Sequence, residues 1–392
     1  MFSQRTSWNL ELNALSVALA EHRAARKPLI DLTRSNPTEC GFHSDSQQLL
    51  AALNNAANLT YEPDPQGLSQ AREAIVEYYS SRNCRVSPRD IFLTTSTSEA
   101  YSFLFRLLCN PGDELLIPQP GYPLFNFLGD LHDVSLIRYP LLYDHGWQID
   151  LHAFERVITP RTRGVIVVHP NNPTGHFCTP AEIQQISKIC STRQIAIISD
   201  EVFLDFNLRD NLAGSFASQS ETLTFTLSGI SKISALPQMK VAWLTATGPE
   251  SLKQQATARL EIIADTFLSM NAPMQHALSV FLQQRHHFRE QWRRRAQSNL
   301  AQFDTLLSSQ TLCTRLETEG GWYVVLKVPL TGSSDDLVME LLTVHGVYIH
   351  PGHFYEFPTD GYLVASLLTP EAELSAGITV LLDVFQKKYS TN

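Results

Sequence analysis

Seven short apolar runs separated by amphipathic stretches constrain the fold of this chain more than any other feature. The runs lie at Ile91–Thr95, Glu114–Pro118, Val134–Pro140, Gly164–His169, Ile195–Ser199, Leu223–Leu227 and Val241–Thr245. Most are rich in β-branched or aromatic residues and do not alternate with polar ones, which is typical of strands buried on both faces. Helical patterns precede or separate several of them, at Leu68–Arg82, Ser98–Leu108 and Pro180–Arg193. This order predicts an α/β fold with a large domain, in which helices sandwich a mainly parallel seven-stranded sheet.

The pattern changes after the last of these runs. A long helical pattern extends from about Ala272 to Leu307, and apolar strands follow at Trp322–Val328 and Gly346–His350 before a last helix from about Pro370. We read this part as a smaller α+β domain. The predicted organisation has three parts: an N-terminal arm packing on the small domain (1–45), the large domain (46–275), and the long connecting helix with the small C-terminal domain (276–392).

Composition limits the kinds of partner. The chain has 392 residues and a formal net charge of −9, which argues against general binding to nucleic acid or to anionic membranes. The basic cluster at Arg285–Arg295 is most simply a solvated face of the long helix. No apolar stretch approaches the roughly 20 residues of a membrane span, and the N-terminus lacks the apolar core of a signal peptide. Six scattered cysteines without metal-binding spacing suit a reducing compartment. We expect a cytoplasmic protein without a metal site.

Polar residues follow several predicted strands, at the edge of an open α/β sheet where ligands bind. Ser96, Thr97 and Ser98 lie between a strand and a helix, and Ser96 with Glu99 fits a capping box. This segment either only caps the helix or also holds a phosphate through free N–H groups and hydroxyls. Tyr122, after the next strand, either packs in the core or stacks on a planar ligand.

Three further strand ends carry reactive or polar groups. Asn172 lies in the turn His169–Gly175 and offers hydrogen-bonding groups to a cleft. Asp200 ends a buried run, where a carboxylate is costly unless it is paired; it is either a structural cap or ion pair, or the partner of a cationic ring nitrogen. Lys232 ends the segment Ser228–Lys232, and burial and cationic neighbours would make its amine a Schiff-base nucleophile.

Together these motifs resemble the class I/II aminotransferases of pyridoxal-phosphate fold type I, over nearly the whole chain. The similar segments are Tyr61–Arg72, the turn Asn171–Gly175, Asp200–Val202, Ser231–Lys232 with Lys240, and Pro351–Phe354. The resemblance implies pyridoxal 5′-phosphate as cofactor and a homodimer in which Tyr61 reaches the neighbouring subunit's site.

The resemblance also implies a role for each residue. Lys232 would form the Schiff base and then move the proton at the substrate carbon, while Asp200 would keep the cofactor's ring nitrogen protonated. Asn172 would bond the phenolic oxygen and Tyr122 would stack on the ring. The residues expected to bind the phosphate are Ser96, Thr97, Ser98, Ser231 and Lys240, with Tyr61 from the neighbouring subunit.

The chain departs from the family pattern at three positions. Phe203 replaces a tyrosine that would bond the phenolic oxygen, and Lys240 replaces an arginine with a bidentate fork. Val364 lies where the family has the arginine that holds the substrate α-carboxylate. Either another cation takes this role, with Arg34 and Lys240 as candidates, or the substrate lacks a conventional α-carboxylate. We also consider Asn36, beside Arg34, a candidate substrate contact.

The resemblance favours an aminotransferase that moves an amino group between a small-molecule donor and a 2-oxo acid or other carbonyl acceptor, through pyridoxamine phosphate. The alternative is a lyase or decarboxylase acting on an amino-acid derivative, because the same cofactor chemistry serves both reactions. A non-enzymatic regulator on this fold is disfavoured, because the first 45 residues are too short for a DNA-reading module and Lys232, Asp200 and Asn172 are all present.

Overall fold

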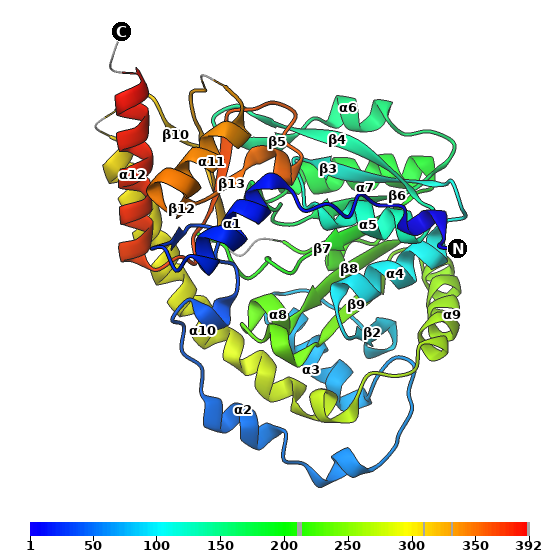
Figure 1. Ribbon diagram of the computed structural model, residues 1–392. Helices are drawn as coiled ribbons and strands as arrows, with labels where there is room; N and C mark the ends of the chain where they lie inside the picture. The colour runs from blue at the N-terminus through cyan, green and yellow to red at the C-terminus, as the bar shows by residue number, and fades with distance from the viewer. Residues whose placement is uncertain (210–213, 309, 331, 390–392) are drawn as a thin grey trace.

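The computed structural model describes residues 1–209, 214–308, 310–330 and 332–389 (Figure 1). Its large sheet consists of β2 (Ile91–Thr94), β3 (Glu114–Gln119), β4 (Ser135–Tyr143), β5 (Trp147–Ile149), β6 (Thr162–Val168), β7 (Ala196–Asp200), β8 (Thr224–Gly229) and β9 (Ala242–Thr247). These strands lie in the order β2-β9-β8-β7-β6-β3-β4-β5. The five from β4 to β8 along this order run parallel, whereas β9 is antiparallel to both of its neighbours.

The predicted α/β fold with a mainly parallel sheet is confirmed, and all seven predicted strands form. The sheet has an eighth strand, β5, which pairs antiparallel with β4 at the edge. β5 has only three residues, including an exposed glutamine, so it leaves no apolar run in the sequence.

The described part of the chain contains twelve α-helices. They are α1 (Ala14–Ala24), α2 (Ser46–Ala52), α3 (Ser69–Ser80), α4 (Thr97–Leu108), α5 (Leu124–Leu131), α6 (Leu151–Arg156), α7 (Pro180–Arg193), α8 (Ile230–Ile233), α9 (Glu250–Thr266), α10 (Ala272–Leu307), α11 (Ser334–His345) and α12 (Glu371–Tyr389). Local sequence sets several of their ends. Thr179 and Glu182 form a capping box at the start of α7, with Pro180 at its first position. Asn271 caps α10 by accepting a hydrogen bond from the Met274 N–H group.

Helices cover both faces of the large sheet, so its central strands are buried on both sides. Ile166 and Val168 of β6 pack in the core formed with α4, α5 and α9. Val165 and Val167 of the same strand pack on the opposite face, in the core that includes α6 and α7. This alternation follows from the two-residue period of a strand. Because both faces of a central strand are buried, most of the runs do not alternate between apolar and polar residues.

A second, smaller sheet is built from the C-terminal part of the chain. It consists of β10 (Thr314–Arg315), β11 (Tyr323–Lys327), β14 (Tyr362–Ser366) and β13 (His350–Pro351), antiparallel and in this order. Beside it, β1 (Ile30–Asp31) pairs parallel with β12 (Val347–Tyr348), and α1 contacts α11. The first residues of the arm lie against the large domain. Arg5 donates a hydrogen bond to Asp133, just after α5, and Trp8 donates one to Asp130 in α5. The boundaries at residues 45 and 275 stay predictions.

The long helix α10 contacts both parts of the molecule, with α3 at one end and α12 at the other (Figure 1). Its basic cluster is not simply solvated. Arg285 lies over the Tyr78 ring, and Arg295 donates hydrogen bonds to the carbonyl oxygens of Cys40 and Leu368. No helix in the described ranges is both long enough and apolar enough to span a membrane.

Candidate active site

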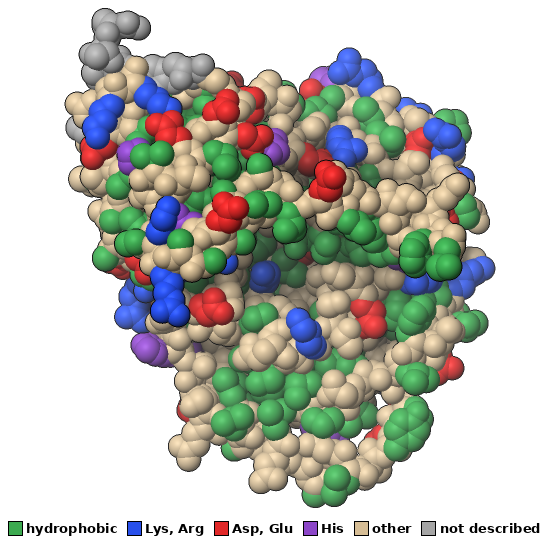
Figure 2. All heavy atoms as spheres, viewed as in Figure 1, with side chains coloured by type: hydrophobic (Ala, Val, Ile, Leu, Met, Phe, Trp, Pro, Cys, Tyr) green, Lys and Arg blue, Asp and Glu red, His purple; other side chains and the backbone are tan. Residues whose placement is uncertain are grey.

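A cavity of about 380 Å³ lies where the carboxyl ends of β6, β7 and β8 face the small sheet. In the view of Figure 2, the face of the molecule between these two parts is hollowed, and hydrophobic side chains gather in the hollow. Nine of the residues predicted from sequence line this cavity: Ser96, Thr97, Ser98, Tyr122, Asn172, Asp200, Phe203, Ser231 and Lys232. They come from five loops that follow strands, as expected for a ligand site on an open α/β sheet.

Lys232 lies on the short helix α8, directly after β8. Its Nζ atom is 4.9 Å from the centre of the Trp322 ring and 5.8 Å from that of Phe203. Burial lowers the pKa of this amine, Asp200 opposes the shift, and the charge of Lys240 adds to it. A lowered pKa increases the fraction of neutral amine, which is the nucleophilic form.

Asp200 ends β7 and is almost fully buried. Its carboxylate accepts hydrogen bonds from the Tyr101 hydroxyl (2.9 Å) and the Val202 N–H group (3.1 Å). Burial nevertheless raises its pKa, because these two bonds and the charge of Lys232 compensate it only in part. The carboxylate can therefore accept a cation from a ligand.

The turn that carries Asn172 is held by its own side chains and by the small domain. Asn171 accepts hydrogen bonds from the hydroxyl and N–H groups of Thr174. Gly175 has φ +73°, and a Cβ atom there would lie 2.5 Å from the Gly320 carbonyl oxygen, so only glycine fits. The buried Asn172 Oδ1 atom has no hydrogen-bond partner within the described structure. This orphaned polar atom is available to a ligand.

Ser96 caps α4, and its Oγ atom accepts a hydrogen bond from the Glu99 N–H group at 3.1 Å. The predicted capping box forms only in part, because the Glu99 carboxylate accepts from the N–H and hydroxyl groups of Thr95 instead. The Thr97 and Ser98 side chains, in the first turn of α4, also line the cavity. A helix N-terminus with adjacent hydroxyls is a favourable place for an anion.

The ring residues differ in how tightly they are held. Tyr122 lines the cavity but is 42% exposed, and its ring meets that of Phe125 edge to face. Phe203 is buried and packs against Trp322 and Phe206. Phe203 offers no hydrogen-bonding group, so this wall of the cavity is apolar.

Five predicted residues do not line the cavity. Lys240 lies close enough to Lys232 for its charge to lower the pKa of that amine. Tyr61 is 81% exposed on the surface. Arg34 pairs with Glu373 at 2.9 Å, and Asn36 caps a short helix by accepting from Thr38. Val364 is buried in a separate apolar cluster with Val325, Tyr355 and Phe357.

Sequence reasoning missed several residues of the site. Tyr101 donates to Asp200 from inside α4, where it reads only as part of an apolar helix face. Ser35, Tyr323, His350, Phe354 and Tyr355 line the cavity from the small domain and the segment beside it. Ser35 lies between the candidates Arg34 and Asn36, and Phe354 ends the family motif Pro351–Phe354. Their places in the sequence could therefore have indicated both residues.

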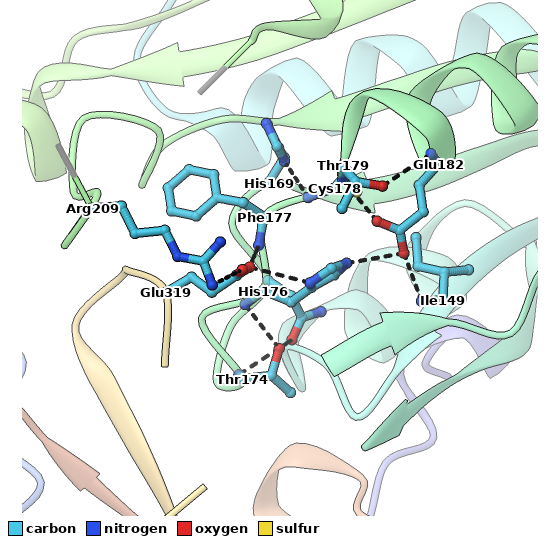
Figure 3. A network of polar contacts seen from close by, with 11 residues as sticks. Ile149, His169, Thr174, His176, Phe177, Cys178, Thr179, Glu182, Arg209 and Glu319 are labelled. Carbon is cyan, nitrogen blue, oxygen red and sulfur yellow. Dashed lines mark hydrogen bonds and ion pairs between the residues drawn. The ribbon is translucent and has the colours of Figure 1, made fainter. Parts of the chain in front are cut away.

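A buried network of charges ties the Asn172 turn to the small domain (Figure 3). His176 Nε2 lies 3.1 Å from Glu182 Oε1, and Nδ1 lies 3.4 Å from Glu319 Oε2. Glu319 also accepts from the Phe177 N–H group and pairs with Arg209. Burial would lower the pKa of His176, but the two carboxylates outweigh it and raise this pKa to about 9. We call His176, Glu182 and Glu319 the histidine bridge.

Within the described ranges, no group of three or more histidine, cysteine, aspartate or glutamate side chains is arranged to hold a metal ion. The cavity lining offers an amine, a carboxylate, an amide and a helix N-terminus.

Comparison with known proteins identifies the family. The family model "Aminotransferase class I and II" matches residues 27–374. Glutamate-pyruvate aminotransferase AlaA of Escherichia coli K12 is 30% identical over 256 residues, which cover 65% of this chain and 63% of that protein. S-alkyl-thiohydroximate lyase SUR1 of Arabidopsis thaliana is 30% identical over 190 residues, covering 47% of this chain and 41% of the lyase.

The solved structure of an alanine aminotransferase from Pyrococcus furiosus superposes with a TM-score of 0.90 over 99% of this chain and 100% of that one. At 22% sequence identity this likeness concerns the fold. The family match extends over most of the sequence and over all nine predicted residues that line the cavity. The chain belongs to the aminotransferase class I and II family.

Proposed function

We propose that this protein is a pyridoxal-phosphate-dependent aminotransferase that moves an amino group between an amino donor and a 2-oxo acid or another carbonyl. The observation that carries the proposal is the convergence of Lys232, Asp200 and Asn172 in one buried cavity at the ends of three adjacent strands. The cofactor of this family, pyridoxal 5′-phosphate, needs an amine, an anion and a hydrogen-bond partner at such a place.

The side chains in the cavity fit this cofactor. The orphaned Asn172 Oδ1 atom belongs to an amide that can turn either its oxygen or its NH₂ group to the phenolic oxygen. Asp200 is a buried carboxylate whose charge is only partly compensated, which suits a cationic ring nitrogen. Ser96, Thr97 and Ser98 at the start of α4, with Ser231 and the charge of Lys240, suit a phosphate.

Each residue has a defined task in the proposed reaction. When bound, the cofactor supplies the electron sink for the carbon that carries the amino group. Lys232 anchors it covalently and, once released, moves a proton to or from that carbon. Asp200 holds the proton on the ring nitrogen. The partly exposed Tyr122 would stack on the ring, and the buried Phe203 gives the cavity an apolar wall.

Reduction of the holoenzyme with borohydride tests the anchor. The cofactor should become fixed to the peptide that contains Lys232, and Lys232→Ala should bind the cofactor only reversibly and lose transfer activity. Lys188→Ala, which removes an exposed lysine from α7, is the matched control and should behave like the wild type. Labelling of any other lysine in the wild type would overturn the proposal.

One observation favours a second candidate, a carbon–sulfur or related lyase. The relative SUR1 of Arabidopsis thaliana is named a lyase, and it is as identical over its matched segment as the aminotransferase relative is over its own. A single turnover with an amino donor and no acceptor separates the two reactions. An aminotransferase leaves the amino group on the cofactor, which mass spectrometry detects as pyridoxamine phosphate. A lyase or decarboxylase releases its product and returns the cofactor unchanged.

We infer that the active form is a homodimer with Tyr61 contributed across the interface. Tyr61 lies on an outer segment where Leu50 and Leu59 are also largely exposed, and such an apolar surface suits a protein contact. Mixing Tyr61→Ala with Lys232→Ala subunits tests this. If the sites are shared, one site of each heterodimer carries no lesion and activity returns. If each subunit supplies its own Tyr61, no mixture regains activity.

We also propose that the protein acts in the cytoplasm. All six cysteines are free thiols, and five of them are buried. Buried unpaired thiols are compatible with a reducing compartment. Fractionation of cells that express the protein, with an enzyme of known location as reference, tests the assignment.

A further inference from the structure

The carboxylate of Asp200 is supported from behind the cavity by a tyrosine. Asp200 lines the cavity, whereas Tyr101 does not belong to the described lining and is buried in the core. The Tyr101 hydroxyl donates a hydrogen bond to Asp200 Oδ2 at 2.9 Å, and the Val202 N–H group donates to Oδ1 at 3.1 Å. Each carboxylate oxygen therefore has a protein donor and can still accept a further hydrogen bond from a ligand.

Core packing holds the Tyr101 ring in place. The ring meets that of Phe105 edge to face at 6.1 Å and that of Phe125 at 5.4 Å. Phe125 in turn lines the cavity and meets the Tyr122 ring edge to face. The helix that carries Tyr101, α4, packs on β8 and β9 of the large sheet. The hydroxyl oxygen is therefore kept beside Asp200 by the packing of its ring and not by the hydrogen bond alone.

The same helix carries residues proposed to bind the phosphate. Thr97 and Ser98, in the first turn of α4, line the cavity. Tyr101 follows them by four and three positions, so it is the neighbour of both on the helix surface. One turn of α4 therefore joins the proposed phosphate site to the hydrogen bond that supports Asp200.

The Tyr101 hydroxyl stays protonated. Burial raises its pKa well above the usual range, and the charge of Asp200 raises it further. A group that always donates stabilises the ionised form of the carboxylate that accepts from it. Burial raises the pKa of Asp200, and the Tyr101 hydrogen bond opposes this shift together with the Val202 N–H group and the charge of Lys232.

Two other buried tyrosines show what distinguishes Tyr101. Tyr139 donates to the Ile166 carbonyl oxygen at 2.9 Å, within the large sheet. Tyr78 donates to Asp205, whose carboxylate is also paired with an arginine. Neither acceptor lines the cavity. The acceptor of Tyr101 does line it, so this hydrogen bond can influence a ligand as well as the fold.

We propose, resting on the proposed aminotransferase function, that Tyr101 is a positioning residue that keeps Asp200 ionised and oriented toward the ring nitrogen of the cofactor. The carboxylate and the ring nitrogen compete for one proton. The Tyr101 hydrogen bond is stronger to the ionised carboxylate than to the neutral acid, so it favours the proton on nitrogen. Tyr101 thereby supports the electron sink without touching the cofactor or the substrate.

The protonation of Asp200 in the apoenzyme tests the hydrogen bond directly. Infrared spectra recorded over a pH series, as differences from Asp200→Asn, show this carboxyl group as it gains its proton. Tyr101→Phe removes one oxygen atom and should raise the pKa of Asp200 by roughly one to two pH units, as expected when a hydrogen bond to a charged group is lost. Tyr139→Phe removes a hydroxyl that is equally buried and is the matched control. It should leave the pKa of Asp200 unchanged.

Kinetics of the holoenzyme test the role in the reaction. Tyr101→Phe should lower kcat about tenfold and leave KM within about twofold, because the side chain does not reach the substrate. In the Asp200→Asn background the same substitution should lower kcat by less than about twofold, because no carboxylate is left for the hydroxyl to support. That background also lacks the buried carboxylate whose lost partner could unfold the single variant, so the comparison is available even if Tyr101→Phe alone is unstable.

An unshifted pKa of Asp200 in Tyr101→Phe would refute the proposal. So would an equal loss of kcat in the two backgrounds, or a loss as large in Tyr139→Phe, because either result would mean that the hydroxyl acts through the fold in general. If the wild-type holoenzyme transfers no amino group from any donor, the proposed function fails. The apoenzyme titration still reports the Tyr101 hydrogen bond in that case, so the two failures are distinguishable.

Discussion

The cavity and the histidine bridge bury charges in opposite ways. In the bridge, His176 is raised to a pKa of about 9 and Glu182 is lowered to about 2, so both partners favour their charged forms. In the cavity, burial lowers the pKa of Lys232 and raises that of Asp200, so both shifts run against the charged form. The two regions lie at neighbouring strand ends, and burial acts on both.

The pKa shifts differ because the protein supplies more hydrogen bonds and opposite charges in the bridge than in the cavity. Besides His176, the Glu182 carboxylate accepts hydrogen bonds from the Ile149 and Thr179 N–H groups. Asp200 receives two hydrogen bonds, and Lys232 rests against two aromatic rings. Charges that the protein compensates in full hold the fold, whereas charges left partly compensated await a ligand. Each prediction below tests whether this division holds.

The largest effect should come from Asp200→Asn. The amide keeps the size and the acceptor oxygen of Asp200 but cannot hold a proton on a cofactor ring nitrogen by charge. We expect kcat to fall on the order of 100- to 1000-fold, as when one electrostatic contact to the transition state is lost. Single-turnover kinetics with a fixed donor would measure it.

Glu201→Gln is the matched control for that change. Glu201 is the next residue and is also buried, but it accepts hydrogen bonds from Ser199, Ser215 and the Phe216 N–H group, away from the cavity lining. We expect it to alter stability and leave kcat within about threefold of the wild type. A fall in kcat as large as that of Asp200→Asn would show that burial alone, not position, makes a carboxylate essential here.

The next effect is on stability, from removing one partner of the bridge. His176→Gln leaves the buried Glu182 and the partly buried Glu319 without their shared cation, and we expect the free energy of unfolding to fall by roughly 3–5 kcal/mol. Urea denaturation of the apoenzyme would measure it. Glu317→Gln, two residues from Glu319 but exposed, should change stability by less than about 0.5 kcal/mol. If the two variants change the free energy of unfolding equally, the histidine bridge contributes no more to stability than an exposed glutamate does.

The bridge also predicts a pH dependence of stability. The pKa of His176 in the folded protein, about 9, is raised above its ordinary value of 6.5. The contribution of His176 to the free energy of unfolding is therefore fully present below pH 6.5. That contribution is lost as pH rises through about 9, by up to roughly 3 kcal/mol. The stability difference between wild type and His176→Gln should therefore narrow from pH 6.5 to 9.5. A difference that stays constant over this range would show that His176 is neutral in the folded protein.

Sequence could predict the part of the site that local order determines. Lys232, Asp200, Asn172 and the start of α4 all follow strands, and parallel strands bring their carboxyl ends to one edge. The long helix α10 was likewise predictable, because Asn271 caps its start and its apolar period continues for 36 residues.

The rest depends on long-range packing that no local pattern encodes. Tyr323 and His350 enter the cavity only because the small sheet packs against the large one. The bridge joins His176 to Glu319, 143 positions later, and either residue alone reads as an ordinary surface charge. Val364 illustrates the same limit, since the sequence shows the valine but not the apolar cluster that encloses it.

The smallest predicted effect comes from adding a hydrogen bond where the cavity lacks one. Phe203→Tyr places a hydroxyl on the wall that Lys232 faces. In the wild type, the centre of the Phe203 ring lies 5.8 Å from Lys232 Nζ. A hydroxyl that donates to the cofactor's phenolic oxygen draws negative charge away from the proton on the lysine linkage. One such bond is worth about 1 kcal/mol, so the pKa of the linkage should fall by somewhat less than about one unit. A pH titration of the absorbance of the bound cofactor would measure this shift. Phe354→Tyr, which adds the same hydroxyl to the small-domain wall, should leave it unchanged. If both variants lower the pKa of the linkage equally, this pKa responds to any added polar group in the cavity. The difference between the cavity and the histidine bridge would then not be explained by specific missing hydrogen-bond partners.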